Sequence, residues 1–100
     1  MNVAALYFTQ TERAFQAEVV KLAHLLGWKT YHTWNSKHSA AGFPDLVLVR
    51  RPRVIFAELK SERGKASSDQ LAWLDALEQC GQEVYQWRPS QWKLIERLLM

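Results

Sequence analysis

The chain has 100 residues, of which 48% are hydrophobic, and a formal net charge of +3. This length and composition fit one globular domain over residues 1–100 and exclude a disordered chain. No apolar run approaches the ~20 residues of a membrane-spanning helix, the N-terminus lacks the regions of a secretory signal, and a lone Cys80 cannot form an internal disulfide, so we expect a cytoplasmic protein without a membrane partner.

A first helix is predicted over residues 9–26. Thr9 and Glu12 have the spacing of a capping box, in which the two residues satisfy free N–H groups at a helix start. The apolar residues recur every three or four positions, as one helix face requires: Phe15, Val19, Leu22 and Leu26. Residues 28–33 alternate like a short strand, and residues 34–43 are small and polar, which predicts a loop.

Two further strands are predicted over residues 45–49 and 54–59, joined by a basic turn that contains Pro52. A second helix is expected over residues 68–80. Its cap is predicted from the spacing of Ser67 and Gln70, and its buried stripe comprises Leu71, Leu74 and Leu77.

A last strand is predicted over residues 83–87, and a short helix is predicted to begin at Pro89, with an apolar side formed by Trp92, Ile95, Leu98 and Leu99. The complete order is α-β-β-β-α-β-α. This order predicts an α/β fold in which helices flank a mixed four-stranded sheet.

Three charged residues stand at the ends of the two central strands. If these strands form an antiparallel hairpin, the start of one meets the end of the other, and Asp45 falls beside Leu59 and Lys60. Glu58 and Lys60 are two residues apart and therefore project from the same face of the sheet. Two carboxylates and an ammonium group are thus expected to converge at one edge.

Adjacent buried carboxylates repel each other, and a divalent cation resolves this conflict. Mg²⁺ prefers hard oxygen ligands, so Asp45, Glu58 and the backbone carbonyl of Leu59 are candidate ligands. Lys60 could orient the attacking water or offset charge on a phosphate in the transition state. Taken singly, each residue has an ordinary alternative, such as a Glu–Lys pair at a strand end; all three together favour catalysis.

The ordered motifs resemble the PD-(D/E)XK nuclease superfamily, and more narrowly the VRR-NUC (virus-type replication-repair nuclease) family. The matching pieces, which cover residues 11–89, are Thr11-Glu12 with Gln16, Leu26-Gly27-Trp28, Gly42-Phe43-Pro44-Asp45-Leu46, Glu58-Leu59-Lys60, and Gly64 followed by Ser67, Gln70 and Trp73-Leu74. The resemblance implies a restriction-endonuclease-like core and a Mg²⁺-dependent DNA endonuclease, with Mn²⁺ able to substitute.

Stand-alone domains of this kind resemble Holliday-junction resolvases, which act on four-way junctions as homodimers in bacteria or phage-infected cells. The resemblance therefore implies branched DNA as substrate and a second copy of the chain as partner. Two alternatives stay open. One is a flap or replication-fork nuclease, and the other is a non-catalytic DNA-binding module with a nuclease-like fold.

By resemblance, Asp45 and Glu58 bind the metal and Lys60 acts on the water. Glu12 matches the acid of the first helix that completes such sites, although the capping box explains it equally well. Gln16 lies one turn later and could reach the site or the DNA, and Glu18 is a less favoured substitute for the helix acid. Gln70 matches a family glutamine and is a catalytic candidate, with capping as its alternative.

Basic residues gather around the acids, and together with them favour phosphate binding, with a solvated surface as the alternative: Lys37, His38, Arg50, Arg51, Arg53, Arg63 and Lys65. Lys37, His38, Arg63 and Lys65 are the chosen candidates for contacts with the DNA backbone. His24 is interpreted as structural. His32 could contact phosphate or belong to a solvated loop. Trp34 could stack on a base, line a dimer contact or pack on its own core.

Overall fold

A four-stranded mixed sheet organises the domain. The computed structural model describes residues 7, 9–33 and 40–100. The strands lie in the order β1 (Lys29–His32), β2 (Leu46–Arg50), β3 (Arg53–Leu59) and β4 (Glu83–Trp87). The first three are antiparallel, and β4 runs parallel to β3. The predicted α/β architecture is confirmed.

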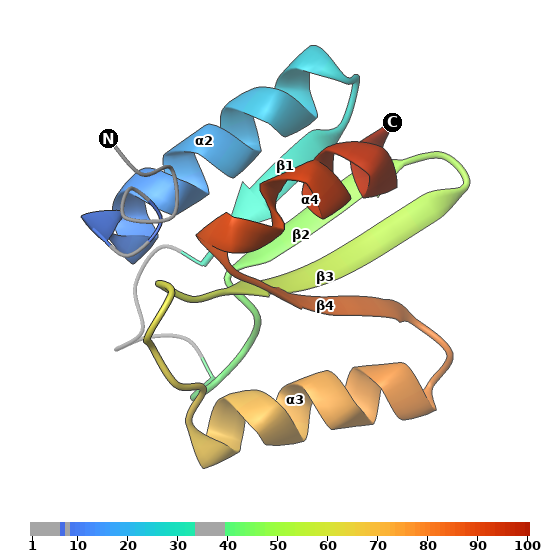
Figure 1. The fold of residues 1–100 in the computed structure, drawn as a ribbon. Helices are drawn as coiled ribbons and strands as arrows, with labels where there is room; N and C mark the ends of the chain where they lie inside the picture. The colour runs from blue at the N-terminus through green and yellow to red at the C-terminus, as the bar shows by residue number, and fades with distance from the viewer. Residues whose placement is uncertain (1–6, 8, 34–39) are drawn as a thin grey trace.

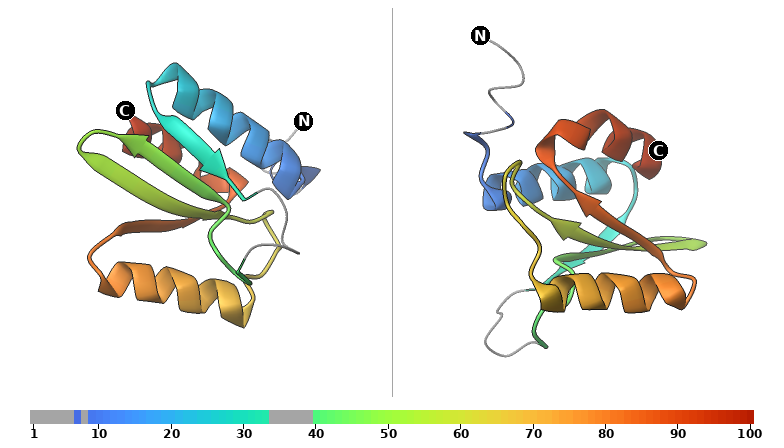
Figure 2. Two further views of the ribbon diagram at one scale, coloured as in Figure 1. Left: turned by 180° about the vertical axis from the view of Figure 1, so that it is seen from behind. Right: turned by 60° about the horizontal axis from the view of Figure 1, so that its bottom comes forward.

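Helices cover the two faces of the sheet unequally (Figures 1 and 2). Helix α2 (Glu12–Leu25) and helix α4 (Trp92–Leu99) lie on one face, whereas α3 (Ser68–Gln79) lies on the other, beside β3 and β4. Between β4 and α4, Pro89–Gln91 form a 3₁₀ turn. No helix in the described parts of the chain is long and apolar enough to cross a membrane.

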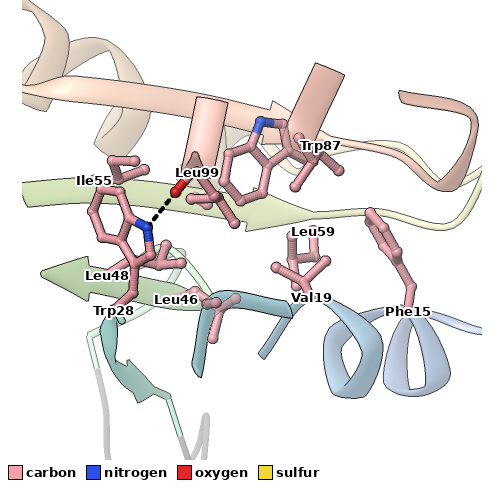
Figure 3. Packing of buried hydrophobic residues seen from close by; sticks show 12 residues of the cluster. Phe15, Val19, Trp28, Leu46, Leu48, Ile55, Leu59, Trp87 and Leu99 are labelled. Atoms are coloured by element: carbon pink, nitrogen blue, oxygen red, sulfur yellow. Dashed lines mark hydrogen bonds between the residues drawn. The ribbon is translucent and has the colours of Figure 1, made fainter. Parts of the chain in front are cut away.

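The core fills the space between the sheet and the α2–α4 layer (Figure 3). Alternate residues of the central strands point into it, because successive side chains of a strand face opposite sides. Among the core residues that are at most 1% exposed are Phe15, Val19, Leu46, Leu48, Ile55, Leu59, Trp87, Ile95 and Leu99. The predicted apolar faces of the first and last helices are therefore largely confirmed.

The first helix begins later than predicted. Thr11 has an extended backbone, with φ −73° and ψ 159°, and its side chain accepts a hydrogen bond from the N–H of Ala14. Thr11 is therefore the N-cap, and the predicted capping box of Thr9 and Glu12 is wrong. Glu12 becomes the first residue of α2, so its carboxylate is available for a contact elsewhere.

Helix α3 is less buried than its apolar stripe predicted. Leu71 is 51% exposed, and Leu74 and Leu77 are half-buried. No residue of this helix is fully buried. The predicted buried stripe is therefore wrong at Leu71. The physical reason is that α3 packs beside β3 and β4 as the one described helix on its face, so its far side meets solvent.

The turn arginines are structural, which corrects the predicted single basic cluster. Arg50 donates hydrogen bonds to the carbonyls of Leu26, Leu99 and Met100 at 2.8–2.9 Å. Arg53 bonds the carbonyl of Leu98 and forms an ion pair with Glu83. These contacts satisfy carbonyls at helix C-termini, where a cation is also favoured by the helix dipole.

Trp28 completes this junction. The guanidinium carbons of Arg50 and Arg53 lie 4.6 and 5.1 Å from the centre of its ring. Its Nε1 donates to the carbonyl of Leu99 at 2.8 Å (Figure 3). Both arginines are therefore committed to the hairpin's turn end, which lies at the opposite end of β2 and β3 from Asp45 and Glu58.

Replacing Arg50 with Ala should lower the free energy of unfolding by about 2 to 3 kcal/mol, because three carbonyls lose a charged donor. Urea denaturation measures this loss. Arg51→Ala is the matched control, since Arg51 is exposed in the same turn, and we expect it to change stability by less than about 0.5 kcal/mol. Equal effects of the two substitutions would contradict the assignment.

Candidate active site

The hairpin of β2 and β3 brings Asp45 to Glu58. Leu46 pairs with Ala57, so the same register carried one residue further sets Asp45 opposite Glu58. The N–H of Leu59 donates to Oδ2 of Asp45 at 2.8 Å, which fixes the Asp45 carboxylate. The predicted register, with Asp45 beside Leu59 and Lys60, is therefore shifted, because the turn is tight and pairs Arg50 directly with Arg53. The predicted meeting of the two acids is nevertheless observed.

Glu58 is fully buried, which is unusual for a carboxylate. Its Oε1 accepts a hydrogen bond from Nε2 of Gln70 at 3.1 Å. Its Oε2 is also buried but finds no hydrogen-bond partner among the described residues. One oxygen is thus held by protein, while the other lacks the partner that a buried polar atom requires.

The surroundings of Glu58 disfavour its charged form. Burial, followed by contact with and repulsion from Asp45, raises the pKa of Glu58 from 4.5 to about 9. Lys60 partly opposes this rise in pKa, and Glu12 adds to it. The acid pair therefore holds less than two negative charges near neutral pH unless a cation joins it.

Lys60 completes the charged group. Its side chain is 9% exposed, and its Nζ lies 4.0 Å from Oε1 of Glu58 and 4.0 Å from Oε1 of Glu12. Its backbone N–H donates to the carbonyl of Trp87 at 3.0 Å, which continues the pairing of β3 with β4. The ammonium group therefore lies between the buried acid of β3 and the first residue of α2.

Gln70 performs both functions that the sequence left as alternatives. Ser67 and Gln70 form the predicted capping box at the start of α3. Because Oε1 of Gln70 accepts from the Ser67 N–H at 2.8 Å, the amide turns its Nε2 toward Glu58. The cap thus orients the side chain that holds the buried carboxylate.

Gly42 allows α3 to reach the site. Its φ is +84°, and a Cβ at this position would lie 2.4 Å from the backbone carbon of Asp69. The loop before Asp45 can therefore lie directly on the first turn of α3. Phe43 secures this contact, since its ring packs edge-on against Phe56 and Trp73, with ring centres 6.3 and 5.1 Å apart.

The loop after Lys60 is held by residues that the sequence did not single out. Nη1 of Arg88 donates to the carbonyls of Ser61 and Gly64 at 2.7 Å and of Glu62 at 3.2 Å. Ser90 bonds the Glu62 carboxylate through its N–H and its hydroxyl. A single arginine after a strand has no motif spacing, so the sequence gave no signal for this contact.

The remaining predicted contacts are distributed around the acids. Arg63 and Lys65 are exposed on the loop that follows Lys60. Gln16 lines a groove between α2 and β1 rather than contacting the carboxylates. His24 is hydrogen-bonded to Thr30 at 2.8 Å, in agreement with its structural interpretation. Lys37, His38 and Trp34 lie outside the described residues.

The donor set fits a divalent cation held by few protein ligands. No cluster of three or more His, Cys, Asp or Glu side chains suited to a metal occurs in the part of the chain that the structure describes. Asp45 and Glu58 form a pair, and the backbone of Leu59 lies between Glu58 and Lys60. The buried, unpartnered Oε2 of Glu58 is the atom that a cation would satisfy. Mg²⁺ typically binds through one or two carboxylates and keeps several waters, so this set is sufficient.

Comparisons with known proteins agree with the fold. The family model described as the VRR-NUC domain matches residues 2–90. A solved structure described as a VRR_NUC domain superposes with a TM-score of 0.71 and 23% sequence identity, covering 88% of this chain and 92% of the other. At this identity the structural match shows the fold alone. The search of curated proteins found no match.

Replacing Glu58 with Gln should change how stability depends on pH. The folded pKa of about 9 exceeds the ordinary value of 4.5, so Glu58 favours folding fully below about pH 4.5, and this contribution is lost as the pH rises toward 9. Gln is neutral throughout. In metal-free buffer, the stability of the variant relative to the unmodified protein should therefore rise between pH 5 and pH 8, by up to about 1.4 kcal/mol per pH unit.

Urea denaturation in EDTA at several pH values measures this difference. Glu78→Gln removes an exposed carboxylate of α3 and serves as the matched control. A difference for Glu58→Gln that stays flat, like that of the control, would show that the buried carboxyl is not perturbed.

Proposed function

Because the chain belongs to the VRR-NUC domain family, we propose that this nuclease-type domain is a metal-dependent DNA endonuclease that resolves four-way junctions as a homodimer. The observation that carries the proposal is the buried Oε2 of Glu58, which lacks a partner while its carboxylate meets Asp45. A structural carboxylate in this position would need a donor for both oxygens.

Asp45 and Glu58 would hold the cation, Mg²⁺ with Mn²⁺ as substitute, and the Leu59 carbonyl is a further candidate ligand. Glu12 reaches this group across Lys60 and would act at its outer edge. When bound, the cation would supply Lewis-acid stabilisation of the phosphate charge and a lowered pKa for the attacking water. Gln70 keeps the Glu58 carboxylate oriented by donating to Oε1.

Lys60 would act directly on the reacting phosphodiester. Its ammonium group is nearly buried beside Glu58, where water screens its charge poorly. A fixed positive charge in such a place stabilises the negative charge that grows on the phosphate oxygens during water's attack. The same group can donate a hydrogen bond that positions this water. Glu12 and Glu58, both 4.0 Å away, keep the ammonium in place.

The choice of a four-way junction and a homodimer follows from symmetry. The described residues of one chain contain one such acid pair with its lysine, and one site cuts one strand at a time. A junction is resolved by two opposed cuts. A C₂ dimer would present two identical sites related by the same twofold symmetry as the junction.

Metal binding should be visible without any reaction. Mg²⁺ or Mn²⁺ at about 100 times its dissociation constant should stabilise the protein by about 2.7 kcal/mol, which corresponds to several degrees in Tm. Asp45→Asn and Glu58→Gln should abolish this shift, whereas Asp75→Asn on the exposed side of α3 should retain it. Thermal denaturation with and without metal tests this, and an equal shift in all four proteins would place the metal elsewhere.

Cleavage should require both acids and the lysine. With Mg²⁺ the unmodified protein should nick synthetic four-way junctions at opposed positions, and Asp45→Ala or Lys60→Ala should lower the rate at least about 100-fold. Junction binding measured with Ca²⁺ should change much less. Unaltered cleavage by either variant would refute the catalytic assignment.

A substrate panel and light scattering separate the proposal from its alternatives. We expect a dimer that prefers four-way junctions to flaps, forks and linear duplex. A monomer that prefers flaps would identify a flap nuclease. Binding without cleavage in every metal and on every substrate would identify a non-catalytic module.

A further inference from the structure

We propose that the groove between α2 and β1 is a second DNA-binding site that holds backbone phosphates away from the scissile bond. The proposal rests on the nuclease function above, and it assigns residues to which neither the motifs nor the comparisons gave a role. The groove has a volume of about 510 Å³, and its polar lining is Arg13, Gln16, Lys21, His24 and His32.

One side of α2 forms the first wall. The lining residues of this helix recur every three or four positions from Arg13 to His24, so they share one face. This face differs from the core face, which carries Phe15 and Val19. Arg13 and Lys21 are both exposed and stand eight residues apart, about 12 Å along the helix. Over that length, one strand of B-DNA carries about three phosphates.

The charge of the groove has one sign. Its lining contains two permanent cations and two histidines, and no acidic side chain. The two acids of α2 lie elsewhere: Glu12 faces Lys60, and Glu18 lines a separate pocket with Pro89 and Trp92. Such segregation is what a polyanion requires, whereas a solvated helix face commonly mixes both signs.

The opposite wall is fixed by β1. The hydrogen bond between Nε2 of His24 and Oγ1 of Thr30, at 2.8 Å, joins the helix to the strand. His32 ends β1 and lines the groove. Because both walls belong to regular elements, the cations are held on a rigid support.

The groove leads to the candidate active site at both walls. On the helix, Arg13 follows Glu12, whose Oε1 is 4.0 Å from Nζ of Lys60. On the strand, His32 pairs with Leu46, and the next residue, Thr33, donates its N–H to the carbonyl of Asp45 at 3.0 Å. A DNA strand bound in the groove would therefore be led to the acids.

The ligand is the phosphodiester backbone rather than a base sequence. The groove offers cations and amide or imidazole groups, which bind phosphate oxygens and fix position without reading sequence. The arrangement of α2 beside β1, on the side of the sheet away from β4, is visible in Figures 1 and 2.

The double variant Arg13→Gln with Lys21→Gln tests the proposal. Fluorescence anisotropy would measure its affinity for a labelled four-way junction, with Ca²⁺ in place of Mg²⁺, at several KCl concentrations. Two lost phosphate contacts should weaken binding by roughly tenfold near 0.15 M salt and make the slope of log K against log salt less steep by about two. The loss should be the same for junctions of unrelated sequence.

Two controls accompany this variant. Arg51→Gln with Arg97→Gln removes two exposed cations, one in the hairpin turn and one in the last turn of α4, and should leave affinity and slope nearly unchanged. Arg13→Lys with Lys21→Arg keeps the charge and should bind like the unmodified protein. Circular dichroism confirms that each variant is folded.

The outcomes separate this proposal from the nuclease assignment. If the groove variant binds with the affinity and salt slope of its charge-matched control, the groove proposal is wrong, even where the protein cleaves junctions. If the groove variant loses affinity as expected but no metal supports cleavage, the groove stands and the catalytic assignment falls. If the unmodified protein binds no DNA, both are overturned.

Discussion

The buried carboxylate of Glu58 is the constraint to which the rest of the structure responds. Removing a carboxylate from water costs several kcal/mol unless partners replace the lost hydration. Here α3 supplies an amide through Gln70, the end of β3 supplies an ammonium through Lys60, and one oxygen remains unpartnered among the described residues. A fold that sought stability alone would place an apolar side chain at this position. The retained acid therefore points to a ligand that is bound through charge.

The hairpin separates structural from chemical electrostatics. Antiparallel pairing sets the turn of β2 and β3 at one end and their free ends at the other. At the turn, Arg50 and Arg53 are fully used on helix carbonyls and on the ring of Trp28. They are thus kept from neutralising the acids about a strand length away. Lys60 alone of the hairpin cations stays beside Glu58, so the charge balance there is left for a metal ion and a phosphate to complete.

Sequence periodicity and motif order predicted the element order, the mixed sheet and the meeting of Asp45 with Glu58, because alternation and strand pairing are local rules. They failed where tertiary contacts decide. Thr11 rather than Thr9 caps α2, since both residues have suitable side chains and the backbone chooses between them. Arg50 looked like a phosphate ligand because the sequence does not show that the chain's own C-terminus lies beside it. The contacts of Arg88 with the loop after Lys60 join segments about 25 residues apart and carry no spacing signal.

Holding DNA beside two carboxylates is itself an electrostatic problem. Phosphates are repelled by the acids, so affinity must come from cations that flank the acids without contacting them. The fold provides two such flanks: the groove of α2 and β1 on one side, and the loop with Arg63 and Lys65 on the other. Arg88 stiffens that loop by bonding its carbonyls, which orders the backbone that carries both cations. Phosphates held on both flanks would draw the intervening phosphodiester toward Lys60, where a cation between the acids would turn local repulsion into attraction.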